Sequence, residues 1–127
     1  MKECFVSEEL VDFTIDGMKF SYKPITAGEE NDWLEDYIDT IPVKKENGDT
    51  VLMRKENLGK LNECKLRLIK MVPWEKEELQ KITGVNKEWE ELDKEQRILV
   101  FKKLKPFIFS QIIKEIRKID NPEEPKN

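Results

Sequence analysis

The chain has 127 residues, of which 39% are charged and 38% hydrophobic, with a formal net charge of −4 and no His. This length suits a single domain over residues 1–127 that buries its own core. The lack of His excludes Ser-His-Asp and Cys-His catalytic sites, His metal ligands and an imidazole pH switch.

The first predicted element is a β-hairpin. Apolar and polar residues alternate over residues 11–15 and again over residues 18–22. Asp16-Gly17 between the two runs favours a type I′ turn, because both residue types tolerate positive φ at low cost. Pro24 ends the second strand, since it cannot donate a hydrogen bond to the ladder.

An amphipathic helix is predicted over residues 27–39. Thr26 and Glu29 match a capping box at its start, in which each side chain accepts from the other residue's amide. The spacing of Trp33 and Tyr37 places both on one apolar face, and the opposite face is acidic.

Residues 43–54 are predicted to form an exposed β-arm. Asn47-Gly48 is a hairpin signal between two runs that are poorer in apolar residues than the first pair of strands. A simple loop over the same residues is the alternative.

The second half of the chain is predicted to be helical. We expect helices over residues 57–71, over 74–81, after the N-cap Asp93, and over 106–119. Residues 1–9 and 120–127 are expected to fray. The fold class is therefore α+β, with a small antiparallel β-hairpin sheet packed against four to five amphipathic helices.

No motif for chemistry emerges from the sequence. There is no Gly-rich phosphate loop and no metal-ligand spacing, so we expect no catalytic residue, no cofactor and no metal, and predict that the protein is not an enzyme. The acid pairs, such as Glu77-Glu78, lie in charged stretches typical of solvated faces, and an unrecognised carboxylate site is the alternative. Cys4 and Cys64 form no CxxC pair, which favours reduced thiols in the cytoplasm. No apolar run reaches bilayer length, so we expect no membrane association.

Charge and apolar residues are unevenly placed along the chain. Residues 1–42 carry 3 bases and 11 acids, whereas residues 98–119 carry 6 bases and 1 acid. The last helix is apolar over more than one narrow stripe, so one face can enter the core while another meets a partner, although a fully buried helix is equally compatible. The aromatic residues of the first predicted helix are also candidates for contact with a protein partner, and a place in the core is the alternative. The candidate interface residues are Phe109, Ile112, Ile113, Ile116, Trp33 and Tyr37.

The segment Phe13–Glu30 resembles the start of tail assembly chaperones of long-tailed bacteriophages and prophages. In that family a hairpin around an acidic-Gly turn leads through a Pro-apolar-Thr/Ser-x-x-Glu step into an acidic amphipathic helix, as Asp16-Gly17 and Pro24-Ile25-Thr26-Ala27-Gly28-Glu29 do here. The resemblance extends over residues 13–38, and Trp89-Glu90-Glu91-Leu92 also fits. The arm around Asn47-Gly48 has no counterpart in the family pattern.

The resemblance implies a holdase rather than an enzyme. Such proteins coat the long helical tape-measure protein until the tail tube polymerises around it. The expected partners are therefore the tape-measure protein or another tail component, together with further copies of the chain. Nucleic acid is not an expected partner, because the sequence pI is about 5.1. An adaptor that binds a regulatory protein or nucleic acid through the basic segments is the alternative function.

Overall fold

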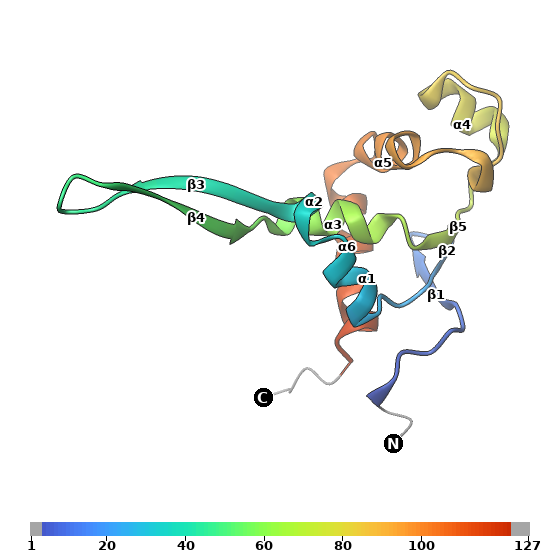
Figure 1. Ribbon diagram of the computed structural model, residues 1–127. Helices are drawn as coiled ribbons and strands as arrows, with labels where there is room; N and C mark the ends of the chain where they lie inside the picture. Colours follow the sequence, from blue (N-terminus) through green and yellow to red (C-terminus); the bar gives the residue numbers. More distant parts are fainter. Residues whose placement is uncertain (1–3, 123–127) are drawn as a thin grey trace.

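The computed structural model describes residues 4–122, and Figure 1 shows an α+β fold from which one long hairpin projects. The expected fraying of residues 1–3 and 123–127 lies outside the described residues. The elements are β1 (Val11–Ile15), β2 (Met18–Tyr22), α1 (Ala27–Asp32), α2 (Leu34–Tyr37), β3 (Ile38–Lys44), β4 (Thr50–Glu56), α3 (Leu58–Leu66), β5 (Ile69–Met71), α4 (Lys76–Thr83), the 3-10 helix η2 (Trp89–Glu91), α5 (Lys94–Lys102) and α6 (Pro106–Asp120).

The first hairpin forms as predicted. β1 and β2 pair antiparallel, with Phe13 opposite Phe20. Asp16 at φ 51° and Gly17 at φ 81° supply the two positive φ angles that a type I′ turn requires. The sheet has a third strand that was not predicted, because β5 pairs antiparallel with β2.

Two predicted helices are wrong at their C-terminal ends. The helix expected over residues 27–39 is two short helices broken at Trp33, and strand β3 begins at Ile38. The helix expected over residues 57–71 ends at Leu66, and Ile69 pairs with β2 instead. In both places tertiary strand pairing overrides the helical period, and β-branched residues such as Ile38 and Ile69 favour the strand.

The core is a layer of apolar side chains between the three-stranded sheet and the helices α5 and α6. Phe20 and Phe101 are fully buried, with ring centroids 6.4 Å apart. Trp89 packs edge-on against Phe101, and its indole Nε1 donates to the carbonyl of Ile69 at 3.0 Å. This contact fixes the connector before α5 to strand β5.

The β-arm is confirmed and is longer than predicted. β3 and β4 pair antiparallel from Ile38 opposite Glu56 to Lys44 opposite Thr50. Gly48 adopts φ 92° and its amide donates to the carbonyl of Lys45 at 3.0 Å, while Asn47 keeps a negative φ. The turn is therefore a three-residue hairpin loop closed by a left-handed Gly rather than the two-residue type I′ turn of the first hairpin.

The predicted capping box at the start of α1 is present. The Thr26 hydroxyl accepts from the Glu29 amide at 3.1 Å, and the Glu29 carboxylate accepts from the Thr26 amide at 3.1 Å. Burial raises the pKa of Glu29, but hydrogen bonds from the Thr26 amide and hydroxyl, together with the charge of Lys23, outweigh it and hold the pKa below its ordinary value of 4.5.

Glu29→Gln is expected to flatten the acid limb of the stability profile. The folded pKa of Glu29 lies below the unfolded value, so its stabilisation is present above pH 4.5 and is lost as the pH falls through the folded pKa. Urea unfolding at about pH 7 and about pH 3 measures this, and the wild type should lose more stability than the variant between these conditions. Equal losses would show that the box carries no linked proton.

Candidate protein-binding groove

An open groove runs between α3 and α6, on the side of the body next to the base of the arm. Its floor is apolar and comes from both helices: Leu58 and Leu61 of α3, and Phe109 and Ile113 of α6. Leu58 is 59% exposed, and Leu61 and Phe109 are half-buried. The groove therefore offers apolar surface to a partner that fills it.

The groove has a basic rim, defined as Lys114, Arg117 and Lys118 of α6. All three side chains are exposed, and their spacing of three and four residues puts them on one face of the helix. Only Lys118 makes an ion pair among the described residues, with Glu115 at 3.4 Å. None of the groove-lining residues within the described range, 4–122, is acidic. The rim therefore attracts an acidic partner.

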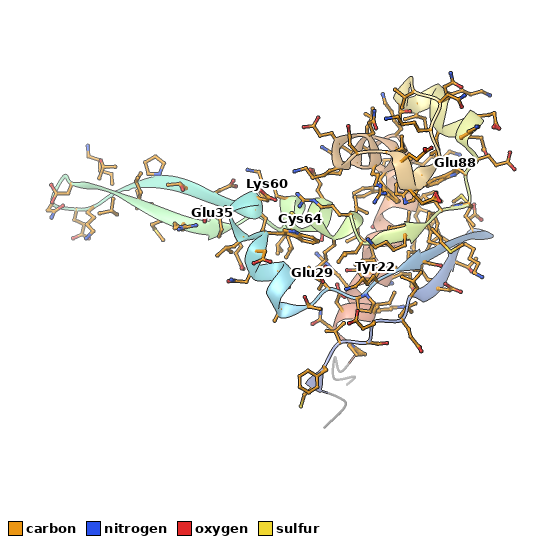
Figure 2. The ribbon with its side chains drawn as sticks, turned by 45° about the vertical axis from the view of Figure 1, so that its right-hand side comes forward. Tyr22, Glu29, Glu35, Lys60, Cys64 and Glu88 are labelled. Carbon is orange, nitrogen blue, oxygen red and sulfur yellow. The ribbon has the colours of Figure 1, made fainter. Side chains whose placement is uncertain are left out.

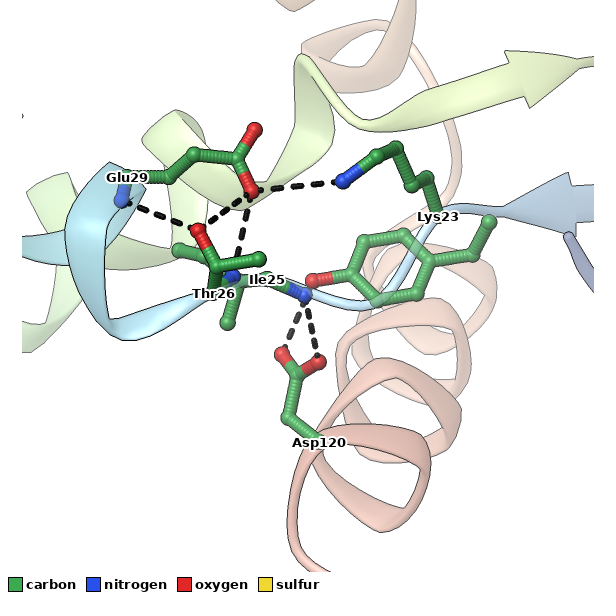
Figure 3. A network of polar contacts seen from close by, with 6 residues as sticks. Lys23, Ile25, Thr26, Glu29 and Asp120 are labelled. Atoms are coloured by element: carbon green, nitrogen blue, oxygen red, sulfur yellow. Dashed lines mark hydrogen bonds and ion pairs between the residues drawn. The ribbon is translucent and has the colours of Figure 1, made fainter. Parts of the chain in front are cut away.

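A buried polar network holds the two walls of the groove together. Asp120, the last residue of α6, accepts from the Tyr22 hydroxyl at 2.8 Å and from the Ile25 amide at 3.1 Å (Figure 3). Lys65 of α3 forms an ion pair with the same carboxylate at 3.2 Å, and the two side chains are only 9% and 4% exposed. One carboxylate thus ties α6 to α3, to β2 and to the segment that precedes α1. Asp120 is an ordered residue and not part of a frayed tail, which corrects that expectation.

The network also changes the chemistry of Tyr22. Burial, together with the neighbouring Asp120 charge, raises the pKa of the Tyr22 hydroxyl, so the phenol stays protonated and keeps donating. The Tyr22 hydroxyl and the Lys65 ammonium both bond to Asp120 within the fold. We therefore interpret this cluster as structural.

The arm is anchored to the body by ion pairs at its base. Lys60 of α3 pairs with Asp39 of β3 at 2.6 Å, and Arg54 of β4 pairs with Glu35 of α2. Glu35 and Lys60 both lie where the arm meets the body (Figure 2). Hydrogen bonds from Lys60 and Asn57 lower the pKa of Asp39, so this carboxylate is ionised at neutral pH.

The structure separates the predicted interface residues into two groups. Ile112 and Ile116 are 0% and 1% exposed, so the prediction that they form a free surface is wrong for the monomer: they pack in the core beneath the sheet. Tyr37 is likewise buried at 2%. Phe109 and Ile113 do reach the groove, although Ile113 is itself mostly buried.

Trp33 lies away from the groove. It is half-buried where α1 meets α2, and the guanidinium of Arg67 sits 5.0 Å from its ring centroid. Sequence reasoning did not single out Leu58 and Leu61 as interface residues, and it noted the rim only as part of the basic segment over residues 98–119. The three-and-four spacing of the rim was the available signal, but pairing α6 with α3 needs the tertiary fold.

Within residues 4–122, no group of three or more potential Cys, Asp or Glu ligands lies close enough to hold a metal ion. No helix in the same range is long and apolar enough to cross a bilayer. None of the family models, curated proteins and solved structures compared with this chain matches it.

Proposed function

We propose that this protein is a non-enzymatic protein-binding factor, a tail assembly chaperone that holds the tape-measure protein through the α3–α6 groove. The observation that carries the proposal is the groove itself, with an apolar floor, a basic rim and no acidic residue among its described lining residues. A surface of this kind fits the apolar stripe of an amphipathic helix whose flanking residues are acidic. The resemblance of residues 13–38 to tail assembly chaperones supplies the identity of the client.

A designed peptide tests the chemistry of the groove. The probe is a labelled amphipathic helix of about 20 residues, with Leu at positions i, i+3, i+4 and i+7 and Glu elsewhere. We expect the acidic peptide to bind in fluorescence anisotropy and a Lys-substituted version not to bind, because the rim repels it. Binding should weaken as salt screens the rim.

Reversing charge on the rim with the variant Lys114→Glu/Arg117→Glu is expected to weaken binding of the acidic peptide by roughly tenfold or more. The matched control, Lys76→Glu/Lys87→Glu, changes the net charge equally at exposed positions outside the groove lining. The control should bind like the wild type. Equal weakening in both variants would mean that only overall charge matters and would contradict the groove as the site.

The client itself is tested by co-expression. A tape-measure fragment should stay soluble when co-expressed with the wild type and should precipitate with the rim variant. We also expect a reading frame for a very long helical protein downstream of this gene. Its absence, together with a failure to keep the fragment soluble, would reject the chaperone role while leaving peptide binding by the groove intact.

The basic rim also supports the second candidate, an adaptor that binds nucleic acid. A DNA duplex in the same anisotropy assay decides between them. Strong, steeply salt-dependent DNA binding that the rim variant loses would favour the adaptor.

A further inference from the structure

The arm has one face that is apolar and uncovered. Because side chains alternate along a strand, Ile41 and Val43 of β3 share a face with Val51 and Met53 of β4, directly opposite them in the register. We call these four residues the arm face. Ile41, Val43 and Met53 are 40%, 36% and 52% exposed.

Nothing in the described body covers the arm face. The arm extends away from the helices and the three-stranded sheet, and only its base touches them (Figure 1). An isolated two-stranded ribbon is at best marginally stable in water, and side chains such as Met53 on its face gain free energy when a second apolar layer covers them. We therefore expect a second apolar surface to cover the arm face.

The charges at the corners of the arm face identify that partner. At the base, Asp39 of β3, which also pairs with Lys60 of its own chain, lies opposite Lys55 of β4. At the tip, Lys45 follows β3 and its amide donates to the carbonyl of Asp49 at 2.7 Å, which places these two residues opposite each other on the same face. The β3 side of the arm face therefore has a negative charge at the base and a positive charge at the tip. The β4 side has the reverse, a positive charge at the base and a negative charge at the tip.

This pattern is self-complementary. If two arm faces pack with the arms antiparallel, the tip Lys45 of one copy lies over the base Asp39 of the other. If the arms run parallel, Lys45 lies over the Asp49 of the other copy. Either twofold arrangement brings opposite charges together at every corner, with the four apolar residues of each copy between them.

We propose that the arm face binds the arm face of a second copy of this chain. β3 and β4 have seven residues each, so the ribbon is about 24 Å long. An interface confined to it belongs to the small, weak class, and dimerisation is therefore concentration-dependent.

Sedimentation of the full chain over a range of concentrations tests the proposal. The wild type should approach twice its 15.1 kDa mass at high concentration. Ile41→Thr/Met53→Thr places β-branched Thr, which favours strands, at both positions but removes the apolar layer, and should weaken the dimer at least roughly a hundredfold. Circular dichroism and binding of the acidic peptide should be unchanged, which separates this result from a failure of the groove.

The matched control lies on the other side of the arm. Leu52 is 70% exposed and its register position places it on the opposite face. Leu52→Thr removes an apolar side chain that is more exposed than Ile41 or Met53 and should leave the dimer intact. A wild type that stays monomeric at all concentrations would overturn the proposal. So would a dimer that is lost with Leu52→Thr or Phe109→Asp but kept in the arm-face variant.

Charge reversals at the tip give an independent test. Lys45→Glu and Asp49→Lys each place like charges together at two symmetry-related corners, so each should weaken the dimer by roughly tenfold. The double swap Lys45→Glu/Asp49→Lys restores pairing when the arms are parallel and worsens it when they are antiparallel. Single reversals without any effect on dimerisation would contradict the complementary corners and the proposal with them.

Discussion

Replacing Ile112 with Asp is expected to unfold the protein rather than to weaken an association. Ile112 is 0% exposed and lies in the same core cluster as Phe20 and Phe101. A carboxylate at this position has no described partner within the core and loses its hydration, which costs about 5 kcal/mol or more. That cost is comparable to the whole stability of a typical small domain.

Tryptophan fluorescence and near-ultraviolet circular dichroism measure the effect of Ile112→Asp. Trp74 and Trp89 both pack against Phe101, so loss of the core should red-shift the emission and remove the aromatic signal. The milder Ile112→Ala should remain folded with a loss of about 2–5 kcal/mol in the free energy of unfolding.

The matched position on the same helix is Phe109. It is half-buried and lines the groove, so Phe109→Asp should keep the fold and lose binding of the acidic peptide. If the Ile112→Asp protein stays folded and only fails to associate, Ile112 belongs to an interface, which would contradict its place in the core.

Asp120→Ala is expected to cost about 3–5 kcal/mol in the free energy of unfolding, measured by urea titration. The substitution leaves the ammonium of Lys65 buried without its ion-pair partner. It also removes the acceptor for the Tyr22 hydroxyl and the Ile25 amide. Each group left unsatisfied carries its own desolvation penalty, and these penalties add to that of the charge.

A double-mutant comparison isolates the buried charge. Lys65→Met/Asp120→Leu removes both partners and replaces them with apolar side chains, so it should cost less than Asp120→Ala alone. Asp120→Asn keeps the shape but loses the charge and should fall between the two. If Asp120→Ala costs less than about 1 kcal/mol, the ion pair does not hold α6 against α3 and the groove walls are positioned by apolar packing alone.

Local signals carry most of the correct sequence predictions. Asp16-Gly17 predicts a turn because only a few residue types tolerate positive φ, and the turn forms with φ 51° and 81°. The N-cap Asp93 accepts from the Gln96 amide at 2.8 Å, as the spacing predicts, since capping depends on residues three apart. The α+β class follows from the order of such elements.

The errors arise where a segment has a helical period but another strand offers it a partner. Residues 69–71 continue the apolar spacing of α3, yet they pair with β2 and bury Ile69. Residues 38–39 likewise leave the helix to begin the arm opposite Lys55 and Glu56. Apolar periodicity describes only neighbouring residues, so it does not reveal a strand partner that lies 16 to 50 residues away in the chain.

The turns, the caps, the apolar last helix and the uneven charge can be predicted from the sequence, because turns and caps depend on neighbours within four residues and the other two on composition. Which side of α6 is core and which is groove depends on the packing of distant segments, since Ile112 and Phe109 are equally apolar and differ only in what packs on them. The tertiary structure also brought Lys65 and Asp120 together across 55 residues of chain. Burial and ion pairing are properties of contacts between distant segments, and a single local pattern does not contain them.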